Sequence, residues 1–306
     1  MRKVLSMCIL RSRLIFIFTL VFIIFSPFVL KGMRVSQTGN EITDIAVGNS
    51  HAMSLNFKSM GLFGVNHYIP SAGIIETVVN FKEVLRLYEG IERVWIPIAP
   101  VLIYRNKQFH GLKWFEELIP FSVVWHYNVV SNDFLAWGLP KSYIRDIRCK
   151  ILSCDTGSMI LVEGAPASIT TVDPNDLTNL AYNTVENHTE YASLENDTNV
   201  RYFKKLLSLA EERNVKVLLF TPPYTDYYYN DPRMSSYVDR YQNEINSLIV
   251  NSDFAHYLDF HDLYDDKNYN FFHDDDHLNL KGAIHFSPLL KNAFTEKDPQ
   301  VFSSRL

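Results

Sequence analysis

Strand-like and helix-like runs alternate along much of this sequence, and this alternation restricts the fold more than any other feature. The amphipathic run 199–213 leads into residues 215–220, a largely apolar run typical of a buried parallel strand. Helix-like spacing over residues 237–250 precedes a strand-like run at 255–260. We therefore expect a parallel sheet with helices on both faces, and functional residues at the carboxyl ends of its strands.

The same alternation is present earlier in the chain. A β-prone run at 42–47, an apolar run at 61–65, a helix-like stretch at 73–88 and a β-rich run at 93–99 form a βαβα pattern. Residues 104–198 break the pattern, and we expect them to be an insertion between core strands. Such an insertion either shapes an active-site cleft or is a structural excursion without a substrate role.

The N-terminal segment has the pattern of a membrane anchor. Residues 1–13 are basic, and residues 14–30 carry no charge. About 20 apolar residues span a bilayer, and a basic flank favours a cytoplasmic N-terminus. We expect 14–30 to be a transmembrane signal anchor and 31–41 a linker, with residues 42–306 forming one extracytoplasmic α/β domain, periplasmic or at the cell surface. The alternative is a cleaved signal peptide, although no small-x-small cleavage site follows.

Composition argues against nucleic-acid binding and leaves open whether two cysteines form a disulfide. The 306 residues are 47% hydrophobic and 14% aromatic, enough to bury a sizeable core. The net charge of −5 gives no basic surface for nucleic acid. Cys149 and Cys154 either close a small disulfide loop or remain free thiols.

Three residues form a candidate catalytic set. Asp274 lies three positions before His277, close enough for the carboxylate to fix the tautomer of the ring and stabilise its protonated form. Far upstream, Ser50 lies in a Gly-Asn-Ser-His turn, where a strand-prone run passes into a helix-compatible segment. Backbone N–H groups at such a turn can stabilise an oxyanion, so Ser50 is a candidate nucleophile.

Around these residues the sequence resembles the SGNH (GDSL-like) hydrolases and acyl-esterases. That family carries its serine in a Gly-x-Ser block, and its acid and base in an Asp-x-x-His block near the C-terminus. The resemblance makes Ser50 the nucleophile, His277 the general base and Asp274 the orienting acid. The stretch FFHDDDHLNLKGA, residues 271–283, is most similar to the membrane-anchored extracytoplasmic branch. This branch includes the lipoteichoic-acid D-alanylation protein and the alginate-type polysaccharide O-acetylation proteins.

The resemblance implies a flavodoxin-like three-layer α/β sandwich, preceded here by one transmembrane helix. It also implies catalysis without a cofactor, a glycan acceptor and a membrane-bound partner that donates the acyl group. His51 and His67 are poorer partners for Ser50: His51 is adjacent to it in sequence, and His67 lacks an acidic neighbour. The crowded acidic turn could instead hold a metal. We expect no metal, because the esterase-like block explains the Leu-Asn-x-x-Gly-Ala tail and metal chemistry does not.

The expected oxyanion hole departs from the family pattern. The second block, FGVNHYIPSAG, contains Asn66 but no glycine at the usual spacing, and VWIPIAPVL lacks the asparagine of the third block. The remaining candidate donors are the backbone of Ser50, the side chain of Asn66 and the turn at Gly73. One lost donor typically costs about a hundred- to a thousand-fold in rate. Asn66 is the expected compensating donor, and a turn-capping role is its alternative.

A tyrosine-rich loop, TPPYTDYYYNDPR, follows the buried strand at its functional end. Two prolines stiffen it, and Tyr224 and Tyr227 are candidates for packing against a sugar ring. The alternative is a loop that simply packs against the domain. Together these features predict a serine esterase or O-acyltransferase that modifies a cell-envelope or exported polysaccharide. The alternative function is a non-catalytic envelope assembly or polysaccharide-binding protein of the same fold.

Overall fold

A computed structural model describes six parts of the chain: residues 42–68, 72–104, 170–190, 192–195, 197–264 and 268–298. The expected anchor at 14–30, the linker at 31–41, both expected disulfide cysteines and most of the expected insertion lie outside these residues. Across the described parts, no helix has the length and apolarity needed to cross a membrane.

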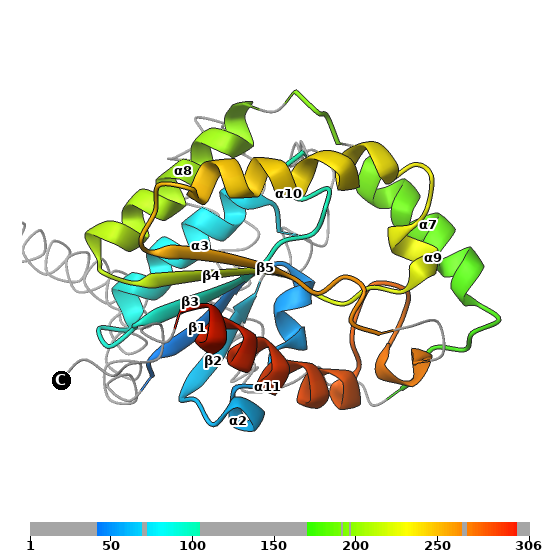
Figure 1. The fold of residues 1–306 in the computed structure, drawn as a ribbon, viewed down its shortest axis with the longest axis horizontal. Coiled ribbons are helices and arrows are strands. Elements are labelled where there is room, and N and C mark those ends of the chain that lie inside the picture. The colour runs from blue at the N-terminus through cyan, green and yellow to red at the C-terminus, as the bar shows by residue number, and fades with distance from the viewer. Residues whose placement is uncertain are drawn as a thin grey trace, which may run out of the picture.

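The core is a sheet of five parallel strands in the order β2-β1-β3-β4-β5 (Figure 1). This order is that of a doubly wound sheet, in which successive strands are added on opposite sides of β1, so that the strand order reverses between β1 and β3. The expected parallel α/β sheet is therefore confirmed. The strands are β1 (Asp44–Gly48), β2 (Gly64–Tyr68), β3 (Arg93–Pro97), β4 (Lys216–Thr221) and β5 (Ala255–Asp259).

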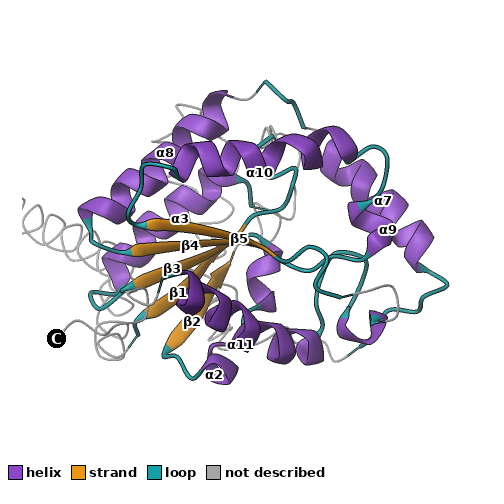
Figure 2. Cartoon of the chain, viewed as in Figure 1, coloured by secondary structure: helices purple, strands orange, loops and turns teal. Residues whose placement is uncertain are grey.

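Helices cover both faces of this sheet, which gives three layers. Figure 2 shows α3, α8 and α10 on one side of the strands, and α2 and α11 on the other. The helical elements are η2 (Ser50–Ser54), α2 (Phe57–Met60), α3 (Ile74–Leu87), α7 (Leu177–Thr189), α8 (Asp197–Glu212), α9 (Asp226–Tyr229), α10 (Ser235–Ile249), η4 (Tyr269–Phe271) and α11 (Leu280–Lys297).

Successive side chains of the central strand β1 enter different layers, as expected for a strand covered on both faces. Ile45 and Val47 belong to the apolar cluster beneath α3, α8 and α10. Ala46 belongs to the second cluster, together with Trp95 and residues of α2 and α11. At the amino end of β1, the buried Asp44 accepts hydrogen bonds from Arg93 Nε at 2.7 Å and Trp95 Nε1 at 2.9 Å. This end of the strand is therefore fixed by a satisfied ion pair.

The second strand begins later than the apolar run at 61–65 predicts. Gly61 has φ +65° and ends α2 in the left-handed conformation, so it belongs to the helix terminus. The polar pair Asn66 and His67 lies within β2 instead, and both side chains are buried and hydrogen-bonded. An apolar pattern could not identify these two residues as part of a buried strand.

Part of the expected insertion forms α7, which lies beside α9 beyond the carboxyl edge of the sheet (Figure 1). Arg233, which lies outside α7, contacts Tyr182 of this helix. Its Nη2 donates to the Tyr182 carbonyl at 3.1 Å, and its guanidinium lies 4.2 Å from the centre of the Tyr182 ring. These contacts fix α7 near the end of the sheet at which the candidate residues gather.

Candidate active site

Ser50 is placed by a sharp turn at the carboxyl end of β1. Gly48 has φ +135°, a conformation that favours glycine, and a Cβ there would lie 3.2 Å from Pro97 Cδ. Asn49 follows as the N-cap of η2, and its Oδ1 accepts the His51 N–H at 3.1 Å. Ser50 therefore opens a short helix at the functional edge of the sheet, as the Gly-Asn-Ser-His turn predicts.

His277 is placed by a tight loop that carries the acidic run. The His273 N–H donates to the His277 carbonyl at 2.8 Å and closes the loop. Asp274 Oδ1 accepts the N–H groups of Asp276 at 3.1 Å and His277 at 2.7 Å. Asp274 thus fixes the backbone of the loop as well as lying next to the imidazole.

The Leu-Asn-x-x-Gly tail of the acidic block fixes the loop to the start of α11. Asn279 Oδ1 accepts the Gly282 N–H at 3.0 Å, and its Nδ2 donates to the carbonyls of Asn270 at 2.9 Å and Phe272 at 3.1 Å. A Cβ on Gly282 would collide with the carbonyl oxygen of Phe271. Asn279 is thus an N-cap with two further contacts, and Gly282 permits close approach of the loop.

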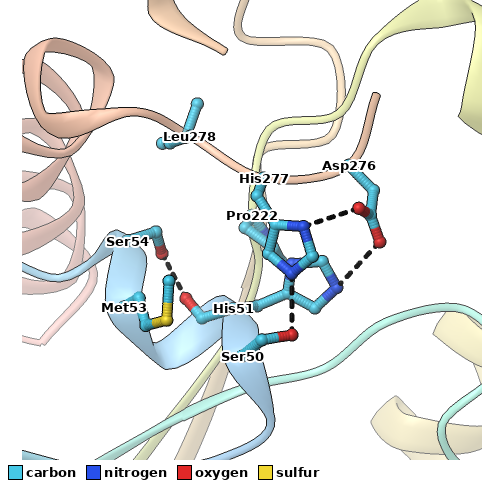
Figure 3. Close-up of a pocket in the computed structure, with 8 residues that line it drawn as sticks. All are labelled: Ser50, His51, Met53, Ser54, Pro222, Asp276, His277 and Leu278. Carbon is cyan, nitrogen blue, oxygen red and sulfur yellow. Dashed lines mark hydrogen bonds and ion pairs between the residues drawn. The ribbon is translucent and has the colours of Figure 1, made fainter. Parts of the chain in front are cut away.

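The structure brings the three expected residues together. Ser50 Oγ lies 2.7 Å from His277 Nε2, although the two residues are 227 positions apart in sequence (Figure 3). On the other side of the ring, His277 Nδ1 lies 3.1 Å from each carboxylate oxygen of Asp274. A hydroxyl, an imidazole and a carboxylate in this order can take a proton from the serine and stabilise the resulting imidazolium.

A second carboxylate reaches the same imidazole. Asp276 Oδ1 lies 2.7 Å from His277 Nδ1, and its Oδ2 lies 3.6 Å from His51 Nε2. Figure 3 shows Asp276 facing both rings, which stack with centroids 4.7 Å apart. Sequence reasoning placed Asp276 in the crowded turn without a role. Three consecutive aspartates are the only sequence signal for it, and they do not indicate which carboxylate faces the ring.

These contacts shift the pKa values of the site in opposite directions. Burial alone would lower the pKa of His277, but attraction to Asp276 and the hydrogen bond to Asp274 raise it well above 6.5. Burial would raise the pKa of Asp274, and its bonds to His277 outweigh burial and lower it. Burial raises the pKa of Asp276, against the attraction of His277. Burial, followed by the charge of His277, lowers the pKa of His51.

Helices α7 and α9 enclose the acidic loop from outside. Thr184 Oγ1 donates to Asp275 Oδ1 at 2.9 Å, and Thr225 Oγ1 donates to the Asp275 carbonyl at 2.8 Å. His188 Nδ1 lies 2.8 Å from the Tyr228 hydroxyl. Burial, followed by the charges of the two neighbouring aspartates, raises the pKa of Asp275 to about 7. The loop is therefore a partly buried polar region held by two helices.

Two expected oxyanion donors are already engaged. Asn66 Nδ2 donates to the carbonyls of Ala52 at 3.1 Å and Leu55 at 3.0 Å, so both of its amide hydrogens are directed at the backbone of η2. The Gly73 N–H donates to Glu76 Oε2 at 3.0 Å, at the start of α3. The expectation that Asn66 and Gly73 face the oxyanion is therefore corrected. Among the three candidates, only the Ser50 N–H has no acceptor within the described residues.

The two candidate tyrosines have different environments. Tyr224 is 1% exposed, and its ring meets that of His51 edge-on at 5.4 Å. It is thus part of the packing behind the site, which corrects the expectation that it contacts substrate. Tyr227 is 41% exposed and lies 6.1 Å from the Tyr269 ring, so it remains available at the surface.

Some of these groups are close enough to share an ion. His51, Asp276 and His277 each place a possible ligand atom within 4.8 Å of the others, and so do the three consecutive aspartates. In the first group, His277 is hydrogen-bonded to Ser50 and paired with Asp276.

A small hollow opens at Ser50, with room for about one water-sized sphere. Met53, Pro222 and Leu278 give it apolar surface, while the serine and His277 give it polar atoms (Figure 3). It is much smaller than the pockets of roughly 300–1,000 Å³ that are typical for drug-sized ligands. The hollow therefore suits a small group.

Comparison with known protein families finds a match over part of the chain. The family model described as DltD protein matches residues 176–292, from the start of α7 into α11. No curated protein is significantly similar to the chain. The matched segment contains Asp274 and His277 and excludes Ser50, so over this segment the chain is similar to DltD proteins.

Proposed function

We propose that this chain is an SGNH-like serine esterase or O-acyltransferase that acts on a cell-envelope glycopolymer. The observation that carries the proposal is the continuous contact from Ser50 Oγ through His277 to Asp274. The serine lies at the end of β1 and the other two residues lie in the loop before α11, so the arrangement depends on the whole fold.

The geometry supports a two-step acyl transfer. Ser50 Oγ attacks the acyl carbonyl carbon while its proton passes to His277 Nε2, and the Ser50 N–H faces the developing oxyanion. The bond to the leaving oxygen then breaks, His277 returns the proton to that oxygen, and an acyl-serine remains. A sugar or polyol hydroxyl, or water, next loses its proton to His277 and attacks the acyl-serine. The bond from the acyl carbon to Oγ breaks, and His277 returns the proton to Oγ, which restores Ser50. The carboxylate at Nδ1 stabilises the imidazolium in both steps.

The small hollow and the family match restrict the substrate. The small size of the hollow at Ser50 favours a short acyl group over a long chain. The match to DltD proteins supports D-alanylation of teichoic acid, in which the acceptor is a glycopolymer hydroxyl. Under this proposal residues 14–30 anchor the body outside the membrane, next to a membrane-bound partner that donates the acyl group.

The engagement of Asn66 and Gly73 favours a second candidate function. With these donors occupied, the chain could hold a glycopolymer or assemble with envelope proteins without turnover. One missing oxyanion donor typically costs a hundred- to a thousand-fold in rate, so the distinction between a slow enzyme and a binding protein is measurable.

Labelling of the full-length chain with a fluorophosphonate separates the two functions. The enzyme proposal expects covalent modification at Ser50, located by peptide mass spectrometry. Ser50→Ala should abolish labelling, and Ser59→Ala, which removes a hydroxyl from the neighbouring helix α2, should not change it. Absence of labelling in folded wild-type protein would favour the binding function.

A further inference from the structure

We propose that Asp276 is a second positioning residue for His277, and that its charge stabilises the protonated ring more strongly than the charge of Asp274 does. The inference rests on the proposed function, in which His277 is the general base. It divides two roles between carboxylates that lie two positions apart in one loop.

The distances place the charge of Asp276 nearest to the ring. Its Oδ1 lies 2.7 Å from His277 Nδ1, whereas both Asp274 oxygens lie at 3.1 Å. Among the described residues, only Asp274 accepts a hydrogen bond from His277 Nδ1, so Asp274 fixes the direction of this N–H. Asp276 pairs with the ring as the nearer charge, and Coulomb attraction strengthens as the distance falls.

The exposure of the two carboxylates also makes Asp276 the stronger charge at the ring. The Asp276 side chain is 3% exposed and that of Asp274 is 31% exposed, so solvent screens the charge of Asp274 more. Asp274 Oδ1 also accepts two backbone N–H groups of the loop. Asp274 therefore has a loop-fixing role that Asp276 lacks.

The second oxygen of Asp276 connects the site to its surroundings. Asp276 Oδ2 lies 3.6 Å from His51 Nε2 and 4.0 Å from His188 Nδ1 and accepts no hydrogen bond within the described residues, so η2 and α7 border the carboxylate. The titratable groups around the Asp276 and His277 pair are Asp274, Asp275, His51, His188, Tyr224 and Tyr228.

The test compares Asp276→Asn with Asp274→Asn in the full-length chain, with Asp275→Asn as the matched control. The rate of fluorophosphonate labelling is measured against pH, and the His277 ring is titrated by NMR with ¹⁵N-histidine. Asp276→Asn should move both midpoints to lower pH by more than Asp274→Asn does, because the nearer and more buried negative charge no longer favours the imidazolium. Asp275→Asn should label within about twofold of wild type.

A larger midpoint shift in Asp274→Asn than in Asp276→Asn would overturn the inference, since a merely structural role does not move the titration of the ring. If Asp276→Asn does not fold, the ring titration of Asp274→Asn alone tests the inference. A His277 midpoint that falls to 6.5 in this variant contradicts the inference, and a midpoint that stays well above 6.5 supports it. The ring titration needs no turnover. Absence of labelling in wild type, with the expected ring shifts intact, would therefore reject the enzyme proposal and leave the division of roles standing.

Discussion

The two sides of the candidate active site are built in different ways. On the acid–base side, Asp274, His277 and Asn279 lie in one loop and its helix cap, and each has its expected neighbour. On the oxyanion side, Asn66 and Gly73 come from separate elements, and both are engaged elsewhere. Spacing within one loop predicts contacts well, whereas donors that converge from separate strands depend on how the whole sheet packs. Three substitutions test this difference, and they are given in order of expected effect.

Gly282→Ala tests how tightly the acid–base side is fixed to α11. The added Cβ would collide with the Phe271 carbonyl oxygen, a backbone atom that cannot rotate away. We expect a loss of about 3 kcal/mol in the free energy of unfolding, at the upper end for overpacking. Urea denaturation measures it. Ile284→Ala, two positions along α11 at a 47% exposed site, should change it by less than about 0.5 kcal/mol. A Gly282→Ala variant as stable as wild type would show that the loop is not held this close to α11.

Asn66→Ala tests the corrected role on the oxyanion side. The change leaves the buried carbonyls of Ala52 and Leu55 without this donor, and we expect a loss of about 2 kcal/mol in the free energy of unfolding. Labelling of the folded fraction should stay within about threefold of wild type. Asn80→Ala removes one buried bond, to the His67 carbonyl, and should cost about 1 kcal/mol. A tenfold slower labelling with unchanged stability would restore Asn66 as an oxyanion donor.

Asp275→Asn tests the electrostatic cost of the acidic loop. Burial and the neighbouring carboxylates raise the pKa of Asp275 from 3.8 to about 7, so the folded protein holds a proton that the unfolded chain releases. Stability that is present below pH 3.8 is therefore lost as the pH rises towards 7. Asparagine cannot ionise, so the variant should be more stable than wild type by about 1 kcal/mol at pH 8 and nearly equal at pH 4.

Thermal unfolding at the two pH values measures this difference. Asp239→Asn, at an exposed position of α10, is the control and should give the same difference from wild type at both. A gain for Asp275→Asn that is equal at pH 4 and pH 8 would show that ionisation is not its cause.

Apolar periodicity predicts most of the fold because the sheet is buried on both faces. The run at 215–220 and strand β4 agree closely, and so do the run at 255–260 and β5. The prediction is poorest at β2, where Asn66 and His67 are buried through hydrogen bonds that periodicity does not detect. The helix α7 was not predicted, because it lies in a stretch without clear alternation.

The predictable part of the site is the part encoded locally. The Asp-x-x-His spacing and the Gly-Asn-Ser-His turn predict the contacts of Ser50, His277 and Asp274 that the structure shows. The contact between the Asp276 carboxylate and the His277 ring was not predictable, because the spacing does not indicate which aspartate faces the ring. The other oxygen of Asp276 faces His51 and His188, which come from two other elements.

The hydroxyl of Ser287 joins the two ends of the described fold: it accepts the Asn56 N–H at 2.8 Å and donates to the Ala283 carbonyl at 2.7 Å. It therefore ties the segment just after Ser50 to the helix that follows His277. During synthesis on the ribosome, the serine emerges 227 residues before its histidine. At about 5–20 residues per second, this delay lasts roughly 10–45 s. Over that interval the nascent chain carries a serine without its base, so the proposed chemistry begins only after α11 has docked.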